Sequence, residues 1–236
     1  MIFVAFGGSG TCYLGRKLRI HGGEYHSRAD AQFKPMFWPT QGGQKLDDMG
    51  YKNYPVTSAI NSFFNSTKFK FNKKKDINEN MIDYVNYIKS KKINSLLTMA
   101  SYYKFFSSNK ISNVCFLVRH PLHQYGSWFK KKRHGSHLKS FGGKDDKRSI
   151  SYFATVWNSF VQEYIDLKND GLSPIIMRYE YIDKDVKNVK SKLMKKCFNG
   201  WNTSRRNVNF INKEMEENMK DMVKDVFFKV YDAWEI

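Results

Sequence analysis

The segment that decides the fold is IFVAF at residues 2–6, followed by GGSGTCYLGRKL at residues 7–18. The apolar run predicts a buried β-strand, and the residues after the glycines predict a helix. Glycine adopts positive φ without steric strain, so the N–H groups of the turn between them can converge on one anion at the start of that helix. The side chains of Ser9, Thr11 and Cys12 offer further donors. We therefore predict a phosphate- or sulfate-binding loop.

Apolar segments alternate with helical patterns along the rest of the chain. Residues 21–58 predict a long irregular connection, and residues 130–148 predict a basic, glycine-containing loop. Alternating strands and helices are typical of a mostly parallel sheet that is covered on both faces. The sequence therefore predicts a single α/β domain over residues 1–236, with three α/β/α layers. Strands are predicted at residues 93–99, 114–118 and 174–179, and helices at residues 80–89, 122–132, 149–168, 185–198 and 212–234.

The composition limits the partners and the cellular setting. The 236 residues carry a formal net charge of +18, which attracts polyanions at low salt. A nucleic-acid partner, an anionic cofactor or substrate, and a base bias of the gene each explain this charge. Nucleic acid is disfavoured as a partner because lysine outnumbers arginine in this chain. Arginine is the residue that best forms paired hydrogen bonds with bases and phosphates. Three widely spaced cysteines without metal-ligand spacing, and no apolar run of about 20 residues, predict a cytoplasmic protein without a metal or membrane segment.

A second loop follows the apolar run VCFLV at residues 114–118. Arg119 stands at the end of this predicted strand, and Ser127 follows on the predicted helix. A guanidinium and a hydroxyl at this spacing can bind one phosphate from two sides. The alternative is that Arg119 pairs with a carboxylate and that Ser127 is a surface residue. Ligands of parallel sheets bind at the carboxyl ends of strands, so we expect a site at this loop and at the glycine loop.

In combination, the two loops resemble the family of sulfotransferases that use PAPS (3′-phosphoadenosine 5′-phosphosulfate). Gly8-Ser9-Gly10-Thr11-Cys12-Tyr13 is similar to the family's Lys-Ser-Gly-Thr-Thr-Trp loop, which binds the 5′-phosphosulfate. Arg119-His120-Pro121 with Ser127 is similar to the motif that binds the 3′-phosphate. Arg178-Tyr179-Glu180-Tyr181-Ile182 is similar to the family's Tyr-Glu-Asp-Leu segment, whose Tyr lies near the adenine. The resemblance covers residues 2–200 and implies a fold like that of P-loop nucleotide hydrolases.

The resemblance implies transfer of a sulfuryl group from PAPS to an acceptor hydroxyl, with PAP as the desulfated product and no metal. Relatives that modify carbohydrates or proteins place a carboxylate base shortly after the first helix. Glu24 is the first candidate for this base here, followed by Asp30 and His26. The acceptor can be a carbohydrate, a tyrosine or a small alcohol, and the basic run at residues 130–134 suggests an anionic one. The residues assigned to the cofactor are Gly7, Gly8, Ser9, Gly10, Thr11, Cys12, Tyr13, Arg119, Ser127 and Tyr179.

Three departures from the family pattern concern catalytic and binding groups. Gly8 occupies the place of the loop lysine, and residues 98–100 (Thr-Met-Ala) occupy the place of a Lys-Thr-His in cytosolic members. Residues 205–207 (Arg-Arg-Asn) are only a weak counterpart of the C-terminal Arg-Lys-Gly. Two other functions stay open. One is a phosphate-loop nucleotide enzyme such as a kinase, although no Lys follows Gly10 as in an ATPase loop. The other is a nonenzymatic polyanion-binding protein.

Overall fold

The computed structural model describes residues 1–5, 8–21, 24–27, 75, 77–98, 105–129, 146–201 and 211–234. Its centre is a sheet of five parallel strands in the order β2-β3-β1-β4-β5. The strands are β1 (Ile2–Ala5), β2 (Glu24–Ser27), β3 (Ser95–Thr98), β4 (Val114–Val118) and β5 (Ile175–Arg178). All except β2 lie where the sequence predicted strands. The predicted parallel sheet is thus confirmed within the described residues.

β1 is the middle strand of the sheet, with β3 on one side and β4 on the other. A strand in this position is covered on both faces and has to be apolar at every residue, not only at alternate ones. β1 and β4 are accordingly buried along their whole length. This is the physical reason why both strands appear in the sequence as continuous apolar runs.

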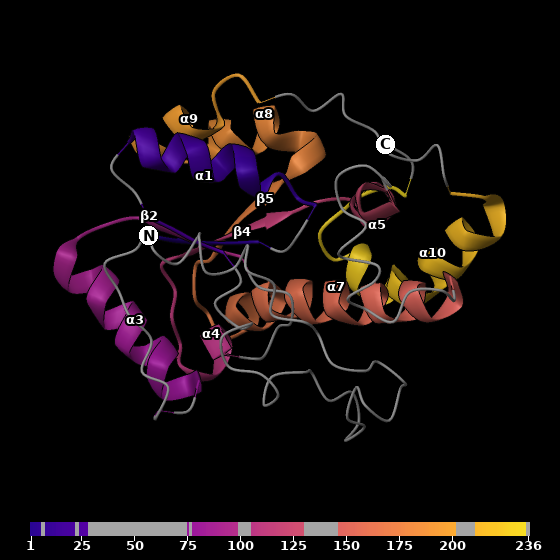
Figure 1. Cartoon of the computed structure of the whole chain (residues 1–236), viewed down its shortest axis with the longest axis horizontal. Coiled ribbons are helices and arrows are strands. Elements are labelled where there is room, and N and C mark those ends of the chain that lie inside the picture. Colours follow the sequence, from indigo (N-terminus) through magenta and orange to yellow (C-terminus); the bar gives the residue numbers. More distant parts are fainter. Residues whose placement is uncertain are drawn as a thin grey trace.

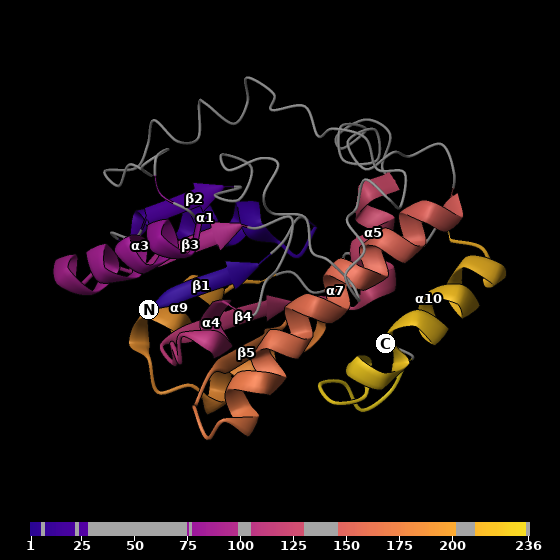
Figure 2. The same cartoon turned by 90° about the horizontal axis from the view of Figure 1, so that it is seen from below.

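Two layers of helices cover the sheet (Figure 1). Figure 2 shows α7 and α10 next to each other, where they pack in one layer. The arrangement is compatible with the predicted three-layer α/β/α architecture. One face carries α1 (Thr11–Ile20), α8 (Ile182–Asp185) and α9 (Lys192–Phe198), the other carries α3 (Ile77–Lys91), α4 (Phe105–Ser108), α7 (Asp146–Asn169) and α10 (Lys213–Phe227), and α5 (Pro121–Phe129) follows β4.

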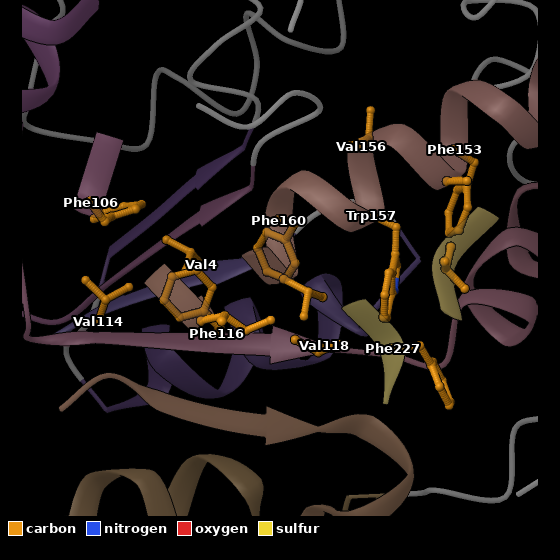
Figure 3. Packing of buried hydrophobic residues seen from close by; sticks show 14 of the residues in the cluster. Val4, Phe106, Val114, Phe116, Val118, Phe153, Val156, Trp157, Phe160 and Phe227 are labelled. Carbon is orange, nitrogen blue, oxygen red and sulfur yellow. The ribbon is translucent and has the colours of Figure 1, made fainter. Parts of the chain in front are cut away.

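The larger core lies between the sheet and α7 (Figure 3). Phe160 of α7 packs against Phe116 of β4, with ring centroids 5.5 Å apart. Trp157 stacks on Phe227 of α10 at 6.1 Å. Burial of each such ring contributes roughly 2–3 kcal/mol. Trp157 also donates its indole N–H to the carbonyl oxygen of Arg119 (2.9 Å), which ties this core to the residue that follows β4.

The strand β2 corrects the prediction that residues 21–58 form an irregular connection. Residues 24–27 pair with β3 in parallel register, with Glu24 opposite Ser95 and Ser27 opposite Thr98. β2 has one neighbouring strand among the described residues, so the polar sequence Glu-Tyr-His-Ser is compatible with its place at the sheet edge. The periodicity missed this strand because it is short and contains no apolar run.

The predicted helix at residues 185–198 is divided into two pieces. A 3-10 turn at Val186–Asn188 follows α8, Val189 is extended, and α9 begins after Ser191. The Ser191 hydroxyl accepts a hydrogen bond from the N–H of Met194 and so caps α9. An amphipathic pattern does not reveal this break, because the residues on both sides of it contribute apolar side chains to the same core.

α10 ends earlier than the predicted helix at residues 212–234. It stops at Phe227, and the following residues turn back over the helix end. Tyr231 stacks on Phe227 with centroids 4.8 Å apart and the rings nearly parallel, and Trp234 packs on the same ring at 4.8 Å. Both aromatic side chains are buried in this turn. They follow Phe227 at i+4 and i+7, so the helical pattern of the sequence continues past the end of α10.

The remaining boundaries differ from the predictions by a few residues. α5 begins at Pro121, which suits the first position of a helix because proline lacks an N–H group. Residues 146–148, predicted as the end of the basic loop, form the first turn of α7. Within the described ranges, no helix is long and apolar enough to cross a membrane.

Candidate functional site

Three adjacent strands bring the predicted motifs to one edge of the sheet. β1, β4 and β5 are neighbours, so the residues after Ala5, Val118 and Arg178 meet at the carboxyl ends of these strands. These residues belong to the glycine loop, the Arg-His-Pro motif and the segment that begins at Tyr179. Motifs that lie far apart in the sequence therefore form one candidate site.

The glycine loop has the backbone conformation that the sequence predicted. Gly8 has a φ of +90° and Gly10 a φ of +91°, which other residues rarely adopt. Ser9 between them is buried. α1 begins directly after the loop at Thr11 and has no acidic residue in its first turn, so the positive end of its dipole is not offset there. The loop and the helix start together are suited to bind an anion.

Arg119 connects the glycine loop to the other motifs. Its Nη1 donates a hydrogen bond to the carbonyl oxygen of Gly8 (2.8 Å). Its guanidinium carbon lies 4.4 Å from the centre of the Tyr179 ring, and its Nε lies 3.8 Å from a carboxylate oxygen of Glu180. The guanidinium is buried. The alternative that Arg119 pairs with a carboxylate is therefore observed, together with contacts to both other motifs.

Ser127 lies against the glycine loop. It is buried, so the alternative that it is a surface residue was wrong. Its hydroxyl donates a hydrogen bond to the carbonyl oxygen of Gln124 within α5 (2.7 Å). A Cβ atom on Gly8 would collide with the Ser127 Oγ and lie 3.1 Å from that carbonyl oxygen. This arrangement leaves no room for a side chain at position 8, where the resembling family has lysine.

The Glu180 carboxylate is the centre of a buried polar cluster beside Arg119. It accepts hydrogen bonds from the backbone N–H of His120 (3.2 Å) and the hydroxyl of Tyr231 (3.0 Å), and lies 3.2 Å from the Nδ1 of His123. Burial raises the pKa of Glu180, but the hydrogen bond with His123 and the nearby positive charges more than offset it and hold this pKa below its ordinary value. We call Glu180, its three partners His120, His123 and Tyr231, and the adjacent Arg119 the Glu180 cluster.

His120 links the Glu180 cluster to the residues after α10. Its Nε2 lies 2.8 Å from the carbonyl oxygen of Trp234, which can only accept, so Nε2 carries the proton. Burial lowers the pKa of His120 to about 4, and the neighbouring His123 acts in the same direction. The rings of Phe227 and Trp234 pack against His120 at 5.1 and 4.8 Å. Residues 228–234 therefore support the site, which the sequence analysis did not predict.

Residues 199–201, which follow α9, pack against the glycine loop. The sequence analysis also missed this contact. Gly200 has a φ of +69° and turns the chain so that Trp201 packs over Gly10. The hydroxyl of Tyr13 donates to the carbonyl oxygens of the two residues before Trp201 (3.0 and 3.2 Å). Only the packing of α9 on α1 makes this segment part of the loop, and no pattern in the sequence signals that contact.

The candidates for the catalytic base lie on or after the edge strand β2. Glu24 is at the amino end of β2, in register with Ser95 and, through β3, with Ile2. Strand residues rise about 3.3 Å each, so the backbone of Glu24 is about 10 Å before the carboxyl end. His26 is one residue before that end. Asp30 lies outside the described residues.

Comparisons with known proteins assign no family to this chain: no protein-family model matches it, and no curated protein matches it. The described residues contain no group of His, Cys, Asp and Glu that could hold a metal ion. Outside the described part of the chain are Gly7, residues 99–100, 130–134 and 205–207, and the side chains of Cys12, Glu24, His26 and Thr98.

Proposed function

We propose that this chain binds PAPS at the edge formed by β1, β4 and β5 and transfers its sulfuryl group to an acceptor hydroxyl. The observation that carries the proposal is the hydrogen bond between Arg119 Nη1 and the Gly8 carbonyl oxygen (2.8 Å). It joins an anion-binding loop at a helix start to a second motif that carries a buried cation. A fold like that of P-loop nucleotide hydrolases, with the glycine loop after the central strand, is part of the proposal.

PAPS supplies the sulfuryl group, and the residues of the chain bind and orient it. The N–H groups at residues 8–11 and the start of α1 would bind the 5′-phosphosulfate, and Arg119 with Ser127 would bind the 3′-phosphate. Tyr179, whose ring lies against the Arg119 guanidinium, would face the adenine. Because Gly8 replaces lysine, the loop N–H groups and the helix dipole have to stabilise the charge on the leaving oxygen. The proposal involves no metal ion.

The base that accepts the proton of the acceptor hydroxyl is proposed to lie at or beyond the end of β2. Ser27 is in register with Thr98, and Thr98 with Ala5, so the carboxyl end of β2 reaches the edge from which the glycine loop starts. This register places the backbone of His26 closer to that edge than the backbone of Glu24, so we favour His26 over Glu24 as the base, and Asp30, which follows β2 outside the described residues, stays a candidate. With an acceptor in hand, Asp30→Asn or His26→Ala should lower kcat by about a hundredfold, whereas Glu24→Gln should leave it unchanged.

A ligand comparison tests the proposed function. PAP should raise the unfolding free energy by about 2.7 kcal/mol at a hundredfold excess over its Kd, and ADP at equal concentration should do less, because ADP lacks the 3′-phosphate. Arg119→Lys keeps the charge but loses the planar fork, and should weaken PAP by about tenfold. The matched control is Arg178→Lys at the end of β5, where the Arg178 guanidinium is paired with Asp185 of α8. Equal stabilisation by PAP and ADP would contradict the proposal.

A second candidate function is suggested by the exposed lysines of one segment. Residues 184–196 run along α8 and α9 on one face of the sheet, and a lysine-rich surface attracts polyanions. A polyanion-binding protein should bind heparin with steep salt dependence and should not distinguish PAP from ADP. Stability measured with ATP beside PAP and ADP tests the alternative of a kinase-like enzyme, which ATP should stabilise most. The exposed lysines are Lys184, Lys187, Lys190, Lys192, Lys195 and Lys196.

A further inference from the structure

We propose that the indole N–H of Trp201 binds an oxygen of the phosphate or sulfate group held by the glycine loop. The inference rests on the proposed function, since it places an oxyanion at the same loop. It adds a specificity-determining residue that lies far from all three motifs in the sequence. It also makes the end of α9 a part of the ligand site.

The Trp201 ring is held in one place by three other rings. Tyr13 packs edge-on at 4.7 Å, Phe198 is tilted at 5.3 Å, and Tyr179 packs edge-on at 5.4 Å. Two of these residues, Tyr13 and Tyr179, come from the predicted cofactor motifs. The indole is therefore rigid relative to the glycine loop, which a hydrogen bond to a bound anion requires.

The six-membered ring of the Trp201 indole packs on the glycine loop at Gly10. A Cβ atom on Gly10 would lie 2.6 Å from Cζ2 and 2.8 Å from Cη2 of Trp201. Cζ2 is bonded to Cε2, which carries Nε1, so the N–H group is two bonds from the ring atom that lies closest to Gly10. Any side chain at Gly10 would displace this edge. The glycine is needed both for its positive φ and for the approach of the ring.

The indole N–H of Trp201 is a buried donor that lacks a hydrogen-bond partner in the part of the chain that the structure describes. Trp201 is only 7% exposed. Trp157 and Trp234, by contrast, donate their indole N–H groups to Arg119 (2.9 Å) and Glu216 (3.0 Å). An indole N–H can only donate, and leaving it unpaired in a buried position is costly. An anion on the loop would supply the missing acceptor.

The local charge also favours an anionic acceptor for this N–H. Positive φ at two glycines allows backbone N–H groups of the loop to converge on an anion, and the first turn of α1 contains no acidic side chain. Lys17 lies over the Tyr13 ring on the same helix, 5.4 Å from its centre. A neutral ligand would gain little from these groups, whereas a phosphate or sulfate oxygen is attracted by all of them.

The decisive measurement follows the indole N–H itself. The chain has five tryptophans, so a ¹⁵N–¹H spectrum shows at most five indole signals, and the Trp201 signal is identified by its loss in Trp201→Phe. This signal should move on titration with PAP, and also with sodium sulfate at constant ionic strength. The Trp234 signal should stay in place, because its N–H is already bound to Glu216.

Binding constants test the same inference independently. Trp201→Phe should weaken PAP by about tenfold. Tyr87→Phe, an aromatic substitution on α3 in the other core, is the control and should change PAP affinity by less than twofold. If Trp201→Phe folds poorly, 3-benzothienylalanine at position 201 keeps the bicyclic ring and replaces only the N–H by sulfur. It should give the same tenfold loss.

The outcomes separate this inference from the proposed function. If PAP binds the wild type but its affinity is unchanged without the Trp201 N–H, the inference is overturned and the proposed function survives. If PAP does not bind but sulfate moves the Trp201 signal, the PAPS assignment fails and the Trp201 anion site stands. If neither ligand moves the signal or binds, both are overturned.

Discussion

Glu180 and Trp201 are both buried at the carboxyl edge of the sheet, but their polar atoms are in opposite situations. The Glu180 carboxylate has donors from His120 and Tyr231, the His123 ring and the nearby charge of Arg119. The Trp201 indole N–H has no partner within the described residues. A buried group that the protein satisfies contributes to folding, whereas one left open is available to a ligand. We therefore expect mutations at Glu180 to change stability first, and mutations at Trp201 to change affinity first.

The largest expected effect is that of Glu180→Gln. It removes the carboxylate charge beside the buried Arg119 and puts an amide donor where three donors already converge. We expect a loss of about 3 kcal/mol in the unfolding free energy, measured by urea denaturation. The matched control is Glu217→Gln, an exposed partner of Lys213 at 3.9 Å, which should cost a few tenths of a kcal/mol at most. Similar losses in both variants would mean that the Glu180 cluster does not stabilise the fold.

Acid should destabilise the Glu180 cluster through His120. Burial lowers the pKa of His120 to about 4 in the folded state, against an ordinary value of 6.5. The unfolded chain therefore takes up the proton first, and the stability contributed by neutral His120 is lost as the pH falls from about 6.5 to 4. Relative to His120→Gln, which keeps a donor for the Trp234 carbonyl, the wild type should lose about 3 kcal/mol over this range. A constant difference between them would contradict this.

A carboxyl outside the cluster should show the opposite pH dependence. Glu163 of α7 accepts hydrogen bonds from the N–H and the hydroxyl of Ser107 (2.7 and 3.1 Å), yet burial raises its pKa from 4.5 to about 7. The folded state then holds the proton longer, so stability falls as the pH rises from about 4.5 to 7. Relative to Glu163→Gln, the wild type should lose about 3 kcal/mol across this range. Chemical denaturation at pH 5 and pH 8 checks both predictions. From pH 5 to pH 8 the unfolding free energy of the wild type should rise relative to His120→Gln and fall relative to Glu163→Gln.

Gly10→Ala tests the packing of the Trp201 ring on the glycine loop. Position 10 combines a φ of +91° with the Trp201 ring, whereas Gly171 has a φ of +75° with nothing within 4 Å of a Cβ atom. Gly171→Ala should therefore cost only the backbone strain, about 1 kcal/mol. Gly10→Ala should cost about 2 kcal/mol more, because the added methyl group collides with the indole. Equal losses of unfolding free energy would show that Trp201 does not pack on the loop.

The smallest effects come from removing one hydroxyl in each region. Tyr231→Phe keeps the stacking on Phe227 but removes a donor to the Glu180 carboxylate, and should cost about 1.5 kcal/mol. Tyr13→Phe removes a hydrogen bond to exposed carbonyl groups and should cost about 0.5 kcal/mol. Tyr13→Phe should nevertheless weaken PAP, because it loosens the turn before Trp201. The comparison fails if Tyr231→Phe is the variant that loses affinity.

The parts of the fold that the sequence predicted are those whose signal is local. β1 and β4 are buried on both faces, so their apolar runs identify them directly. Parallel pairing then places the loops after them at one edge, which is why Gly8 and Arg119 could be expected to meet. Their contact is a single hydrogen bond of 2.8 Å.

The parts that the sequence did not predict depend on tertiary contacts. β2 is polar because one edge of it has no neighbouring strand among the described residues. The turn after α10 exists because Tyr231 and Trp234 pack back on Phe227. Trp201 reaches the glycine loop only because α9 packs on α1. Tyr231 and Trp234 follow Phe227 at helical spacing, so periodicity predicts a longer helix there, and β2 and Trp201 have no periodic signal from which their contacts could be predicted.

The central place of β1 has a consequence for synthesis on the ribosome. Ile2 of β1 pairs with Ser95 and with Val114, so this apolar strand leaves the exit tunnel long before either neighbour. An unpaired apolar strand is a binding site for chaperones and a risk for aggregation. Nascent chains stopped before residue 114 should be captured by chaperones and cleaved by protease. Resistance should appear only in chains that have released Tyr231, whose hydroxyl completes the Glu180 cluster.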